Sequence, residues 1–449
     1  MCGEKGALLN GKSIFGATVL LAVGISYFGY AASFLSSILV ARLLGAEGKG
    51  VFSLFMESTF GIVLLSSLGI GNGQIYEVSK NPKEMIHFLA NAFFFSITFG
   101  TGVALLYYLA GLFWHFKIVT LLKLPDIILG ILVIPILTMV IFQRQYFLAN
   151  HSYKMAKANG AMTTVIPMFI YLIMYGFGIV TITHLIMAFV LGQLVCFLVF
   201  HVLILKSLPK HGGLSIPMAK KSISFGIWQY LSDLCSFLIR RLDFFLVISI
   251  LGQSGLGIYS VAVAMAEITS RLTHEIGTIL FPEFASDNIA KGRAAPILRK
   301  TLFSMTIIAS LLALASRPLI LLLFGNQFAE SIPAFQLLLL GTIALGTIDV
   351  TWNYTAAKGK VKLGIPIFGI GAILDVALNF VLLPSFGVLG ASFAATISYC
   401  LAAFLFLRVF CKNEGCSVRE ALVIRKDDIR EIIRSVHAIP QLIIKRSSL

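Results

Sequence analysis

The stretch that decides the fold, Ser222–Phe284, reads SISFGIWQYLSDLCSFLIRRLDFFLVISILGQSGLGIYSVAVAMAEITSRLTHEIGTILFPEF. Two long apolar segments flank a short glycine-containing turn, Gly252–Gly257. A membrane-spanning helix needs about 20 mainly apolar residues, so the stretch predicts two such helices. Ionisable side chains interrupt both segments, and each costs about 2.5–3.5 kcal/mol in a membrane helix, which predicts a functional or a paired role. They are Asp233, Arg240, Arg241, Asp243, Glu267, Arg271, His274 and Glu275.

The composition of the whole chain indicates the same class of protein. Of its 449 residues, 58% are hydrophobic and 12% are charged, and the mean hydropathy is +0.93, as is typical of membrane proteins. The net charge of +15 is spread between apolar runs without a continuous basic face, so we expect no nucleic-acid partner. The basic loops are expected to face the anionic inner surface of a membrane. The six cysteines are scattered, without metal-ligand spacing or a disulfide framework.

Hydropathy divides the chain into twelve candidate spans, which predicts an all-α integral membrane protein. The spans are 12–44, 48–76, 84–111, 118–149, 158–180, 184–206, 222–250, 256–284, 298–324, 331–357, 361–383 and 387–411. We expect two six-helix lobes, 1–206 and 222–411, joined by a cytoplasmic linker, 207–221. Residues 412–449 form a basic tail.

Lysine and arginine residues fall mainly on one side of these spans. Of the 35, twenty-seven lie on one side, five on the other and three inside helices. Because positive loops stay in the cytoplasm, this distribution predicts a multi-pass protein of the plasma (inner) membrane with both termini cytoplasmic. It places Arg144 and Lys157 on the cytoplasmic side and Lys49 on the outer side.

An internal repeat relates the two predicted lobes. Leu44–Ser53 reads LGAEGKGVFS and Leu251–Ser260 reads LGQSGLGIYS, at an offset of 207 residues. A looser pair, YFLANHSYK from Tyr146 and YTAAKGKVK from Tyr354, lies at an offset of 208. Two segments at nearly one offset imply two copies of a six-helix unit, and an even number of helices gives both copies the same orientation. We therefore expect a parallel pseudo-twofold axis along the membrane normal and a site between the lobes.

Several segments resemble a known family in their order and spacing. They are ILVARLLGAEGKGVFSLF (38–55), RRLDFFLVISILGQSGLGIYSVA (240–262), RPLILLLFGNQFAESIPAFQLL (317–338) and AAKGKVKLGIPIFGIGAILDVALNFVLLPSFGVLGASFAATIS (356–398). They are similar to the Wzx-type polysaccharide (O-antigen) flippases of the multidrug/oligosaccharidyl-lipid/polysaccharide (MOP) exporter superfamily. The resemblance extends over residues 12–411.

This resemblance implies two six-helix bundles around a cavity that opens alternately to each side of the membrane. It also implies a cargo, a polyprenyl-diphosphate-linked oligosaccharide, flipped from the cytoplasmic to the outer leaflet for polysaccharide or lipopolysaccharide biosynthesis. Membrane lipids and other polysaccharide-assembly proteins are the further partners implied. The chain departs from the 14-helix lipid II flippases of the same superfamily by stopping at twelve helices.

Four arginines are the predicted contacts of such a cargo: Arg240, Arg241, Arg271 and Arg42. An arginine side chain pairs phosphate oxygens through a planar two-point hydrogen bond. Structural roles are the alternative and stay open here: pairing of Arg240 or Arg241 with Glu267, pairing of Arg271 with Glu267 at i, i+4, and snorkelling of Arg42 to the lipid headgroups.

Four carboxylates are predicted to bind a coupling ion: Asp375, Asp349, Glu57 and Glu267. Apart from Na⁺ or H⁺ as this ion, no cofactor is expected. The alternative is hydrogen bonding between helices, and Asn379 lies one turn after Asp375. In the basic tail, DDIREIIRSVHAI (427–439) predicts an amphipathic helix on the inner leaflet.

The sequence contains no phosphate-cradling loop, zinc signature or nucleophile motif, so we expect a transporter and not an enzyme. Three alternatives to a flippase stay open. An ion-coupled small-molecule exporter of the same superfamily would have a cavity poor in arginine and lined by aromatic residues. A membrane-embedded glycan polymerase would need a large outer loop or a cluster of carboxylates. A scaffold would bind lipid-linked precursors without moving them.

Overall fold

The computed structural model describes residues 4–178, 181–207, 212–285 and 294–431, in which helices joined by short turns make up the fold. Within these ranges, nine helical stretches are long and apolar enough to cross a membrane, so the chain is a multi-pass membrane protein. The helices are α1 (Glu4–Ser67), α2 (Ile70–Lys80), α3 (Met85–Phe95), α4 (Thr101–Phe113), α5 (Lys117–Leu121), α6 (Leu124–Ala149), α7 (Tyr153–Gly176), α8 (Ile182–Ser207), α9 (Ile216–Ala285), α10 (Ala294–Leu314), α11 (Ser316–Leu323), α12 (Ser331–Ala357), α13 (Gly364–Phe386), α14 (Val388–Glu414) and α15 (Val418–Leu422).

Helices α1 and α9 each combine two predicted spans. The backbone leaves helical geometry at Gly45, with φ 68° and ψ −172°, and at Gly252, with φ 76° and ψ −167°. Only glycine adopts this conformation without strain, so each glycine is where the chain reverses direction. The two positions correspond in the sequence repeat. When α1 and α9 are divided there, and α3 and α4 are counted as one span, the described residues contain the twelve predicted spans.

Three predicted spans contain a break that hydropathy does not reveal. The predicted span 48–76 is interrupted at Leu68 and Gly69, both with positive φ, and continues as α2. The predicted spans 118–149 and 298–324 each consist of a short and a long helix. Lys123 marks one of these breaks, and Ser316 and Arg317 mark another, but apolar residues flank every break on both sides, so a hydropathy window averages over it.

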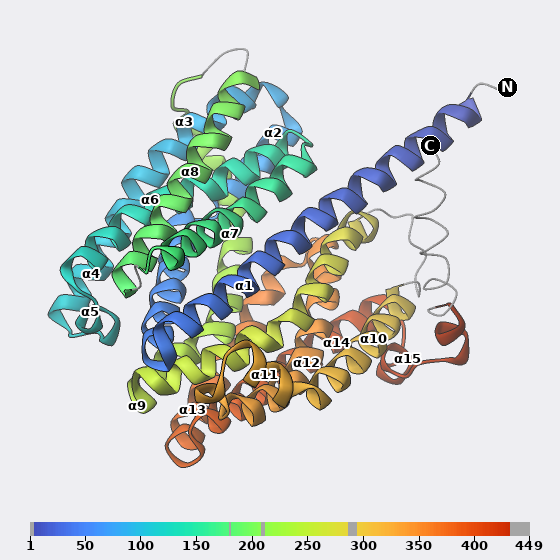
Figure 1. The fold of residues 1–449 in the computed structure, drawn as a ribbon. Helices are drawn as coiled ribbons and strands as arrows, with labels where there is room; N and C mark the ends of the chain where they lie inside the picture. The colour runs from blue at the N-terminus through green and yellow to red at the C-terminus, as the bar shows by residue number, and fades with distance from the viewer. Residues whose placement is uncertain (1–3, 179–180, 208–211, 286–293, 432–449) are drawn as a thin grey trace.

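The helices form two lobes that meet along α1 and α9 (Figure 1). In Figure 1, α2 to α8 lie in the blue-to-green lobe, α10 to α14 lie in the yellow-to-red lobe, and α1 passes between them. We call the end of the bundle with Gly45 and Gly252 the kink end. The opposite end, where α1 starts and α14 finishes, is the tail end.

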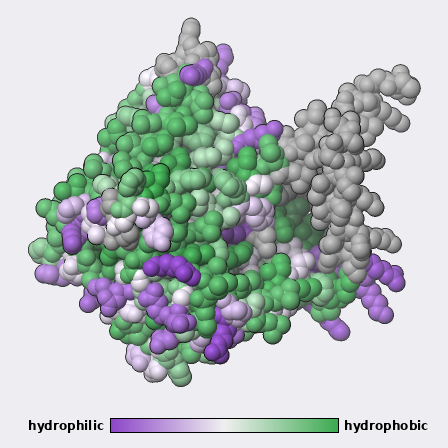
Figure 2. All heavy atoms as spheres, viewed as in Figure 1, coloured by the Kyte–Doolittle hydropathy of each residue, from purple (hydrophilic) through white to green (hydrophobic). Residues whose placement is uncertain are grey.

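Hydrophobic residues cover most of the visible surface, and hydrophilic residues gather toward the ends of the lobes (Figure 2). Phe113, Trp114 and Phe177, at the kink end of the first lobe, are largely exposed. Aromatic side chains in such positions suit the interface between a bilayer and water. The surface therefore agrees with a bundle that stands across a membrane.

The two lobes touch through their backbones at the kink end. A methyl group added at Gly50 would lie 2.0 Å from the Gln253 carbonyl oxygen, and one added at Gly257 would lie 1.8 Å from the Ala46 carbonyl oxygen. Gly50 corresponds to Gly257 in the repeat, and Ala46 to Gln253, so the contact has the symmetry of a twofold axis. Small residues allow membrane helices to approach this closely. We call these four residues the glycine seal.

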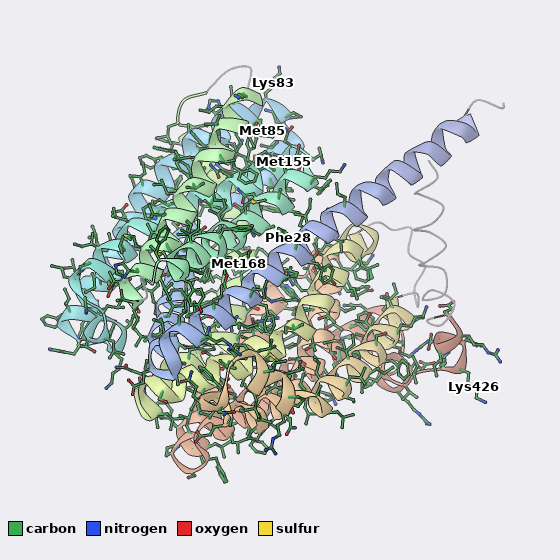
Figure 3. The ribbon with its side chains drawn as sticks, viewed as in Figure 1. Phe28, Lys83, Met85, Met155, Met168 and Lys426 are labelled. Atoms are coloured by element: carbon green, nitrogen blue, oxygen red, sulfur yellow. The ribbon has the colours of Figure 1, made fainter. Side chains whose placement is uncertain are left out.

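Aromatic and apolar contacts complete the packing of the lobes. Tyr76 on α2 stacks on Phe225 near the start of α9, with ring centroids 3.6 Å apart. Met168 on α7 forms a buried cluster with Val165 and with Ala32 of α1, and Figure 3 shows Met168 beside the middle of α1. The first half of α1 thus belongs to the first lobe.

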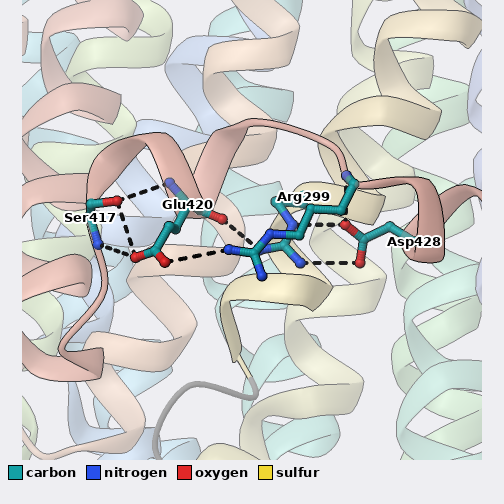
Figure 4. A network of polar contacts seen from close by, with 5 residues as sticks. Arg299, Ser417, Glu420 and Asp428 are labelled. Atoms are coloured by element: carbon teal, nitrogen blue, oxygen red, sulfur yellow. Dashed lines mark hydrogen bonds and ion pairs between the residues drawn. The ribbon is translucent and has the colours of Figure 1, made fainter.

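The segment after α14 folds back onto α10 (Figure 4). The buried Arg299 donates hydrogen bonds from Nε and Nη2 to the two carboxylate oxygens of Asp428, at 2.9 and 3.2 Å, and from Nη1 to the Glu420 carbonyl oxygen at 2.6 Å. Ser417 and Glu420 form a capping box at the start of α15. The predicted amphipathic helix, 427–439, lies largely outside the described residues.

Acidic pH is expected to release this segment from α10. Burial alone would raise the pKa of Asp428, but hydrogen bonds from Arg299 and from the Arg425 amide hold that pKa below its usual range. A carboxylate with a lowered pKa stabilises the folded state at neutral pH, and this contribution is lost as the pH falls through the folded pKa. A protease active at both pH values should cleave 423–431 in the wild type only at acidic pH, and in Asp428→Asn at neutral pH as well. Equal resistance of the two proteins at neutral pH would contradict this expectation.

Candidate functional site

A cavity of about 750 Å³ lies between the two lobes. Its walls are both halves of α1 together with α6, α7 and α8 on one side, and both halves of α9 on the other. This volume is typical of sites that hold a small molecule or a polar headgroup. Its polar and charged lining residues are Tyr27, Tyr30, Ser33, Ser36, Ser37, Lys49, Ser53, Glu57, Arg144, Thr163, Thr164, Tyr171, Gln193, Arg241, Ser260, Glu267 and Arg271.

Arg241 joins two glutamates across this cavity. Its Nε lies 3.0 Å from Glu57 Oε2 on α1, and its Nη2 lies 2.5 Å from Glu267 Oε1 on α9. Arg271 lies 3.5 Å from the other oxygen of Glu267 and 4.9 Å from the centre of the Tyr30 ring, a cation–π distance. The pairing of Arg241 and Arg271 with Glu267 is therefore present, and Glu57 joins it from the opposite lobe.

Arg240 and Arg42 contact other parts of the protein and are not among the residues that line the cavity. Arg240 donates to Asp349 Oδ1 at 3.1 Å and so ties α9 to α12 within the second lobe. Arg42 is exposed at the kink end, where its Nε donates to the Leu323 carbonyl oxygen at 2.7 Å and its Nη2 donates to the Leu322 carbonyl oxygen. Arg42 thereby joins α1 to α11, across the two lobes.

The four predicted coupling carboxylates have different surroundings. Glu57 and Glu267 are held by Arg241, and Asp349 by Arg240. In contrast, Asp375 has no cationic partner among the described residues.

The carboxylate of Asp375 is fully buried within the second lobe. Its Oδ2 accepts a hydrogen bond from Asn379 Nδ2 at 3.1 Å, and its Oδ1 has no hydrogen-bond partner in the described structure. Asp375 and Asn379 both lie on α13, so this hydrogen bond does not join two helices. The Oδ1 atom of Asn379 is also buried and unpartnered.

A second contact between the lobes is centred on Glu275, on the second half of α9. Its carboxylate accepts from the Tyr30 hydroxyl at 2.7 Å, and both of its oxygens lie within 3.0 Å of Lys157 Nζ. Tyr30 and Lys157 belong to α1 and α7, so Glu275 bridges the lobes on the side of the cavity away from the glycine seal. The sequence placed Lys157 in a loop, whereas it lies one turn inside α7.

Glu275→Gln is expected to open the cavity toward the tail end, because an amide forms no ion pair with Lys157. A thiol introduced at Ser36, which lines the cavity, should then react faster with a water-soluble maleimide in a background without native cysteines. Tyr30→Phe, which removes only a hydrogen bond, should give a smaller increase. Equal labelling rates in Glu275→Gln and the unmodified background would show that this contact does not hold the cavity closed.

Two cations that line the cavity were counted at the ends of their predicted spans, Arg144 on the cytoplasmic side and Lys49 on the outer side. Arg144 lies within α6, and Lys49 lies in α1 beyond its kink and is only 6% exposed. Lys49 Nζ donates to Ser37 Oγ at 2.9 Å, and Arg144 Nε is buried without a hydrogen-bond partner. Within the described part of the chain, neither lies within ion-pair distance of a carboxylate. The local signal for Arg144 was its place between Gln143 and Gln145 in an otherwise apolar run.

Comparison with known proteins identifies the family. Residues 39–333, well over half of the chain, match the model of a family described as polysaccharide biosynthesis protein. The chain belongs to this family. Two uncharacterised membrane proteins of Methanocaldococcus jannaschii are 24% and 22% identical to this polysaccharide biosynthesis protein, over 44% and 43% of its length. The matches cover 41% and 45% of these relatives, so the chain spans less than half of their length.

Solved structures share the fold of this polysaccharide biosynthesis protein. A lipid II flippase, MurJ, in an inward closed conformation matches with a TM-score of 0.69 and 15% identity, over 90% of this chain and 89% of the flippase. An inward-facing multidrug resistance MATE transporter of the MOP superfamily matches with a TM-score of 0.64 and 15% identity, over 88% of this chain and 98% of the transporter. The chain therefore shares its two-lobed fold with these two membrane proteins.

Proposed function

We propose that this protein is a flippase that moves a polyprenyl-diphosphate-linked oligosaccharide from the cytoplasmic to the outer leaflet for polysaccharide biosynthesis. One observation carries the proposal: the cavity between the lobes is lined by four cationic side chains and only two carboxylates. An excess of positive charge inside a membrane protein is costly unless it serves an anionic ligand. The family and the fold support the same function, and a polyprenyl chain would stay in the surrounding bilayer.

We propose that the tail end of the bundle faces the cytoplasm of a plasma (inner) membrane. Among the described residues, the start of the basic tail and the connections that contain Lys80, Lys83, Lys154, Lys358 and Lys360 lie at that end, which supports this orientation by the positive-inside rule. Residues 1–206 and 222–411 would form the lobes, with 207–221 as their linker. In this orientation the glycine seal closes the outer side, and Glu275 lies toward the cytoplasmic side. Alternating access would part the seal while the cytoplasmic side closes.

Among the four arginines predicted to bind cargo, we propose roles according to their contacts. Arg241 and Arg271 line the cavity and would form its wall on the second lobe. Arg240 would orient α9 against α12. Arg42 would hold the outer side closed together with the glycine seal.

Depletion of the protein tests the proposed function. Lipid-linked glycan should then accumulate in the cytoplasmic leaflet, where intact spheroplasts protect it from a membrane-impermeant lectin. Accumulation of unpolymerised glycan outside the membrane would indicate a polymerase. Unchanged lipid-linked glycan combined with increased sensitivity to small toxic molecules would indicate an exporter.

We propose Asp375 as the site of the coupling ion, Na⁺ or H⁺. A buried carboxylate without a cationic partner is costly as an ion, and a bound proton or small cation would neutralise it. The unpartnered oxygens of Asp375 and Asn379 suit either ion. An imposed Na⁺ or pH gradient should accelerate flipping by the wild type but not by Asp375→Asn. Retention of this dependence in Asp375→Asn would contradict the assignment.

A further inference from the structure

We infer that a groove on the bilayer-facing surface of the first lobe binds one acyl chain of a phospholipid with an anionic headgroup. The groove has a volume of about 520 Å³. Its walls are one face of Ile86–Thr98, His201 and Leu205 on α8, and Gly212 and Leu214 in the segment that precedes α9. We call it the lipid groove. None of its lining residues also lines the cavity between the lobes, so the two sites are separate.

The surface of the lipid groove is apolar. Phe93, Phe94 and Ile97 line it, and each of these side chains is almost half exposed. The Thr98 hydroxyl donates to the Phe94 carbonyl oxygen at 2.7 Å, so the backbone already satisfies this polar group. The ring of His201 packs near that of Phe93, with centroids 6.5 Å apart. Water has few polar partners in such a groove within a bilayer, so hydrocarbon fills it.

The length of the lipid groove matches one leaflet of a bilayer. Ile86 and Thr98 are about 18 Å apart along their helical stretch, at 1.5 Å per residue. Ile86 lies near the start of the membrane-spanning stretch Pro82–Phe113, and Thr98 lies halfway along it. Because the hydrocarbon core is about 30 Å thick, the groove reaches from the tail end to about the midplane. One acyl chain of the leaflet at the tail end has this reach, whereas a polyprenyl chain extends further.

The inner end of the lipid groove has an unusual backbone. Ser96–Gly100 form a π-helical turn between α3 and α4, and Thr98 of this turn lines the groove. Such turns are rare and occur frequently at functional sites. A helix that only faces lipid needs no π-helical turn, so its position at the end of the groove supports a bound ligand.

Positive charge lies beside the tail end of the lipid groove. Lys83 is exposed in the turn before α3, close in sequence to the lining residue Ile86. Figure 3 shows Lys83 at the tail end of the first lobe. Lys206 is exposed in the last turn of α8, next to the lining residue Leu205. The acidic residue nearest to Lys83 is Glu84, so the lysines outnumber it. Lysines near a membrane surface attract anionic lipids over about a Debye length, without direct contact.

The third wall of the lipid groove belongs to the chain that joins the lobes. The Gly212 N–H donates to the Ile86 carbonyl oxygen at 3.0 Å, and the Asn91 side chain exchanges two hydrogen bonds with the Ser215 backbone, at 2.9 and 3.2 Å. A β-carbon at Gly212 would lie 2.8 Å from the Ile86 carbonyl oxygen, whereas one at Gly213 would meet nothing within 4 Å. The groove needs this segment on α3, so a bound lipid would stabilise the contact.

Photo-cross-linking of the purified full-length protein in nanodiscs tests this inference. The probe is phosphatidylglycerol with a diazirine in one acyl chain, diluted into unlabelled phosphatidylcholine, and the cross-linked peptides identify the residues that it contacts. Cross-links should concentrate on 86–98, Leu205 and Leu214. Equal cross-linking of the other lipid-facing helices, such as α13 and α14, would overturn the inference. Stronger cross-linking of the groove by a polyprenyl phosphate probe would identify a different occupant and would also overturn it.

Two matched pairs of variants separate the lipid groove from the rest of the lipid-facing surface. Ala90→Trp fills the groove and should largely abolish cross-linking to Leu205 and Leu214, whereas Leu106→Trp, an exposed change on α4, should not. Gly212→Val should act like Ala90→Trp because it displaces the third wall, and Gly213→Val should be neutral. Equal cross-linking in Ala90→Trp and Leu106→Trp would overturn the inference. If Gly212→Val does not fold, Ala90→Trp, which keeps the third wall, decides alone.

The headgroup is tested by comparing phosphatidylglycerol with a phosphatidylcholine probe that carries the same diazirine chain. Lys83→Gln and Lys206→Gln should each lower the preference for phosphatidylglycerol by about fivefold, the effect of one lysine near a membrane surface. Lys117→Gln, an exposed change on α5, should leave this preference unchanged. Equal cross-linking of the two probes to the wild type would overturn the inference. The flippase proposal would still stand, because the groove is separate from the cavity.

Discussion

Arg241→Ala is expected to destabilise the protein, because it removes the cation shared by two half-buried carboxylates. Loss of one member of a fully buried ion pair costs about 3–5 kcal/mol, which is the upper bound for this partly exposed cluster. Glu57 and Glu267 both depend on Arg241, at 3.0 and 2.5 Å. Without it, Glu57 has no cation within ion-pair distance in the described structure, and Glu267 retains only Arg271 at 3.5 Å. The purified variant should show a much lower melting temperature and a lower yield from membranes.

A compensating variant distinguishes charge balance from a loss of side-chain volume. Glu57→Gln and Glu267→Gln, combined with Arg241→Gln and Arg271→Gln, remove all four charges of the cluster together and should restore most of the stability. Arg408→Ala, a change of an exposed arginine on α14, should have little effect. Wild-type stability in Arg241→Ala would show that the cluster does not hold the lobes together.

Gly257→Val is expected to abolish transport by preventing closure of the glycine seal. A β-carbon at Gly257 would lie 1.8 Å from the Ala46 carbonyl oxygen, a distance that real β-carbons do not adopt. Because the obstacle is backbone, the kink ends of the lobes must separate. A cavity thiol at Ser36 should then become reactive from the outer side of sealed vesicles, and lipid transfer should fall to the rate without protein.

The repeat supplies a matched control for this prediction. Gly50→Val should give the same result, because a β-carbon at Gly50 would clash with the Gln253 carbonyl oxygen, just as one at Gly257 would clash with the Ala46 carbonyl oxygen. Gly102→Ala should be harmless, because nothing lies within 4 Å of a β-carbon at Gly102. Different outcomes at Gly50 and Gly257 would contradict the twofold symmetry of the seal.

The repeat and the hydropathy pattern predicted most of the fold. The offset between Gly45 and Gly252 identified two positions that share one backbone conformation. The spans were predicted well because a long apolar run requires burial in a membrane or a core. This requirement does not depend on which other helices pack against the run. The break at Leu68 was missed because it depends on backbone conformation within an apolar run.

The partners of the intramembrane charges were harder to predict, because they depend on how each helix is rotated. The Arg241–Glu267 pair lies within one pair of helices and was among the alternatives, whereas Glu57 comes from the other lobe. Lys49 and Arg144 were counted with the charges on either side of the membrane, because each lies near the end of its predicted span. Their location in the cavity follows from the helix bounds and from the packing of the two lobes.

Transfer of a lipid-linked saccharide across a liposome membrane tests the central claim most directly. The substrate is a fluorescent prenyl-diphosphate-linked oligosaccharide, and the fraction of its fluorescence that an impermeant quencher removes reports the leaflet in which it lies. The protein carries Ala46→Cys and Gln253→Cys, one on each side of the glycine seal. We expect the protein to accelerate transfer. A reducible bifunctional thiol reagent that cross-links the two cysteines should stop the transfer, and reduction of the cross-link should restore it. Transfer at the protein-free rate before cross-linking, or unchanged transfer after it, would contradict a flippase that works by parting its two lobes.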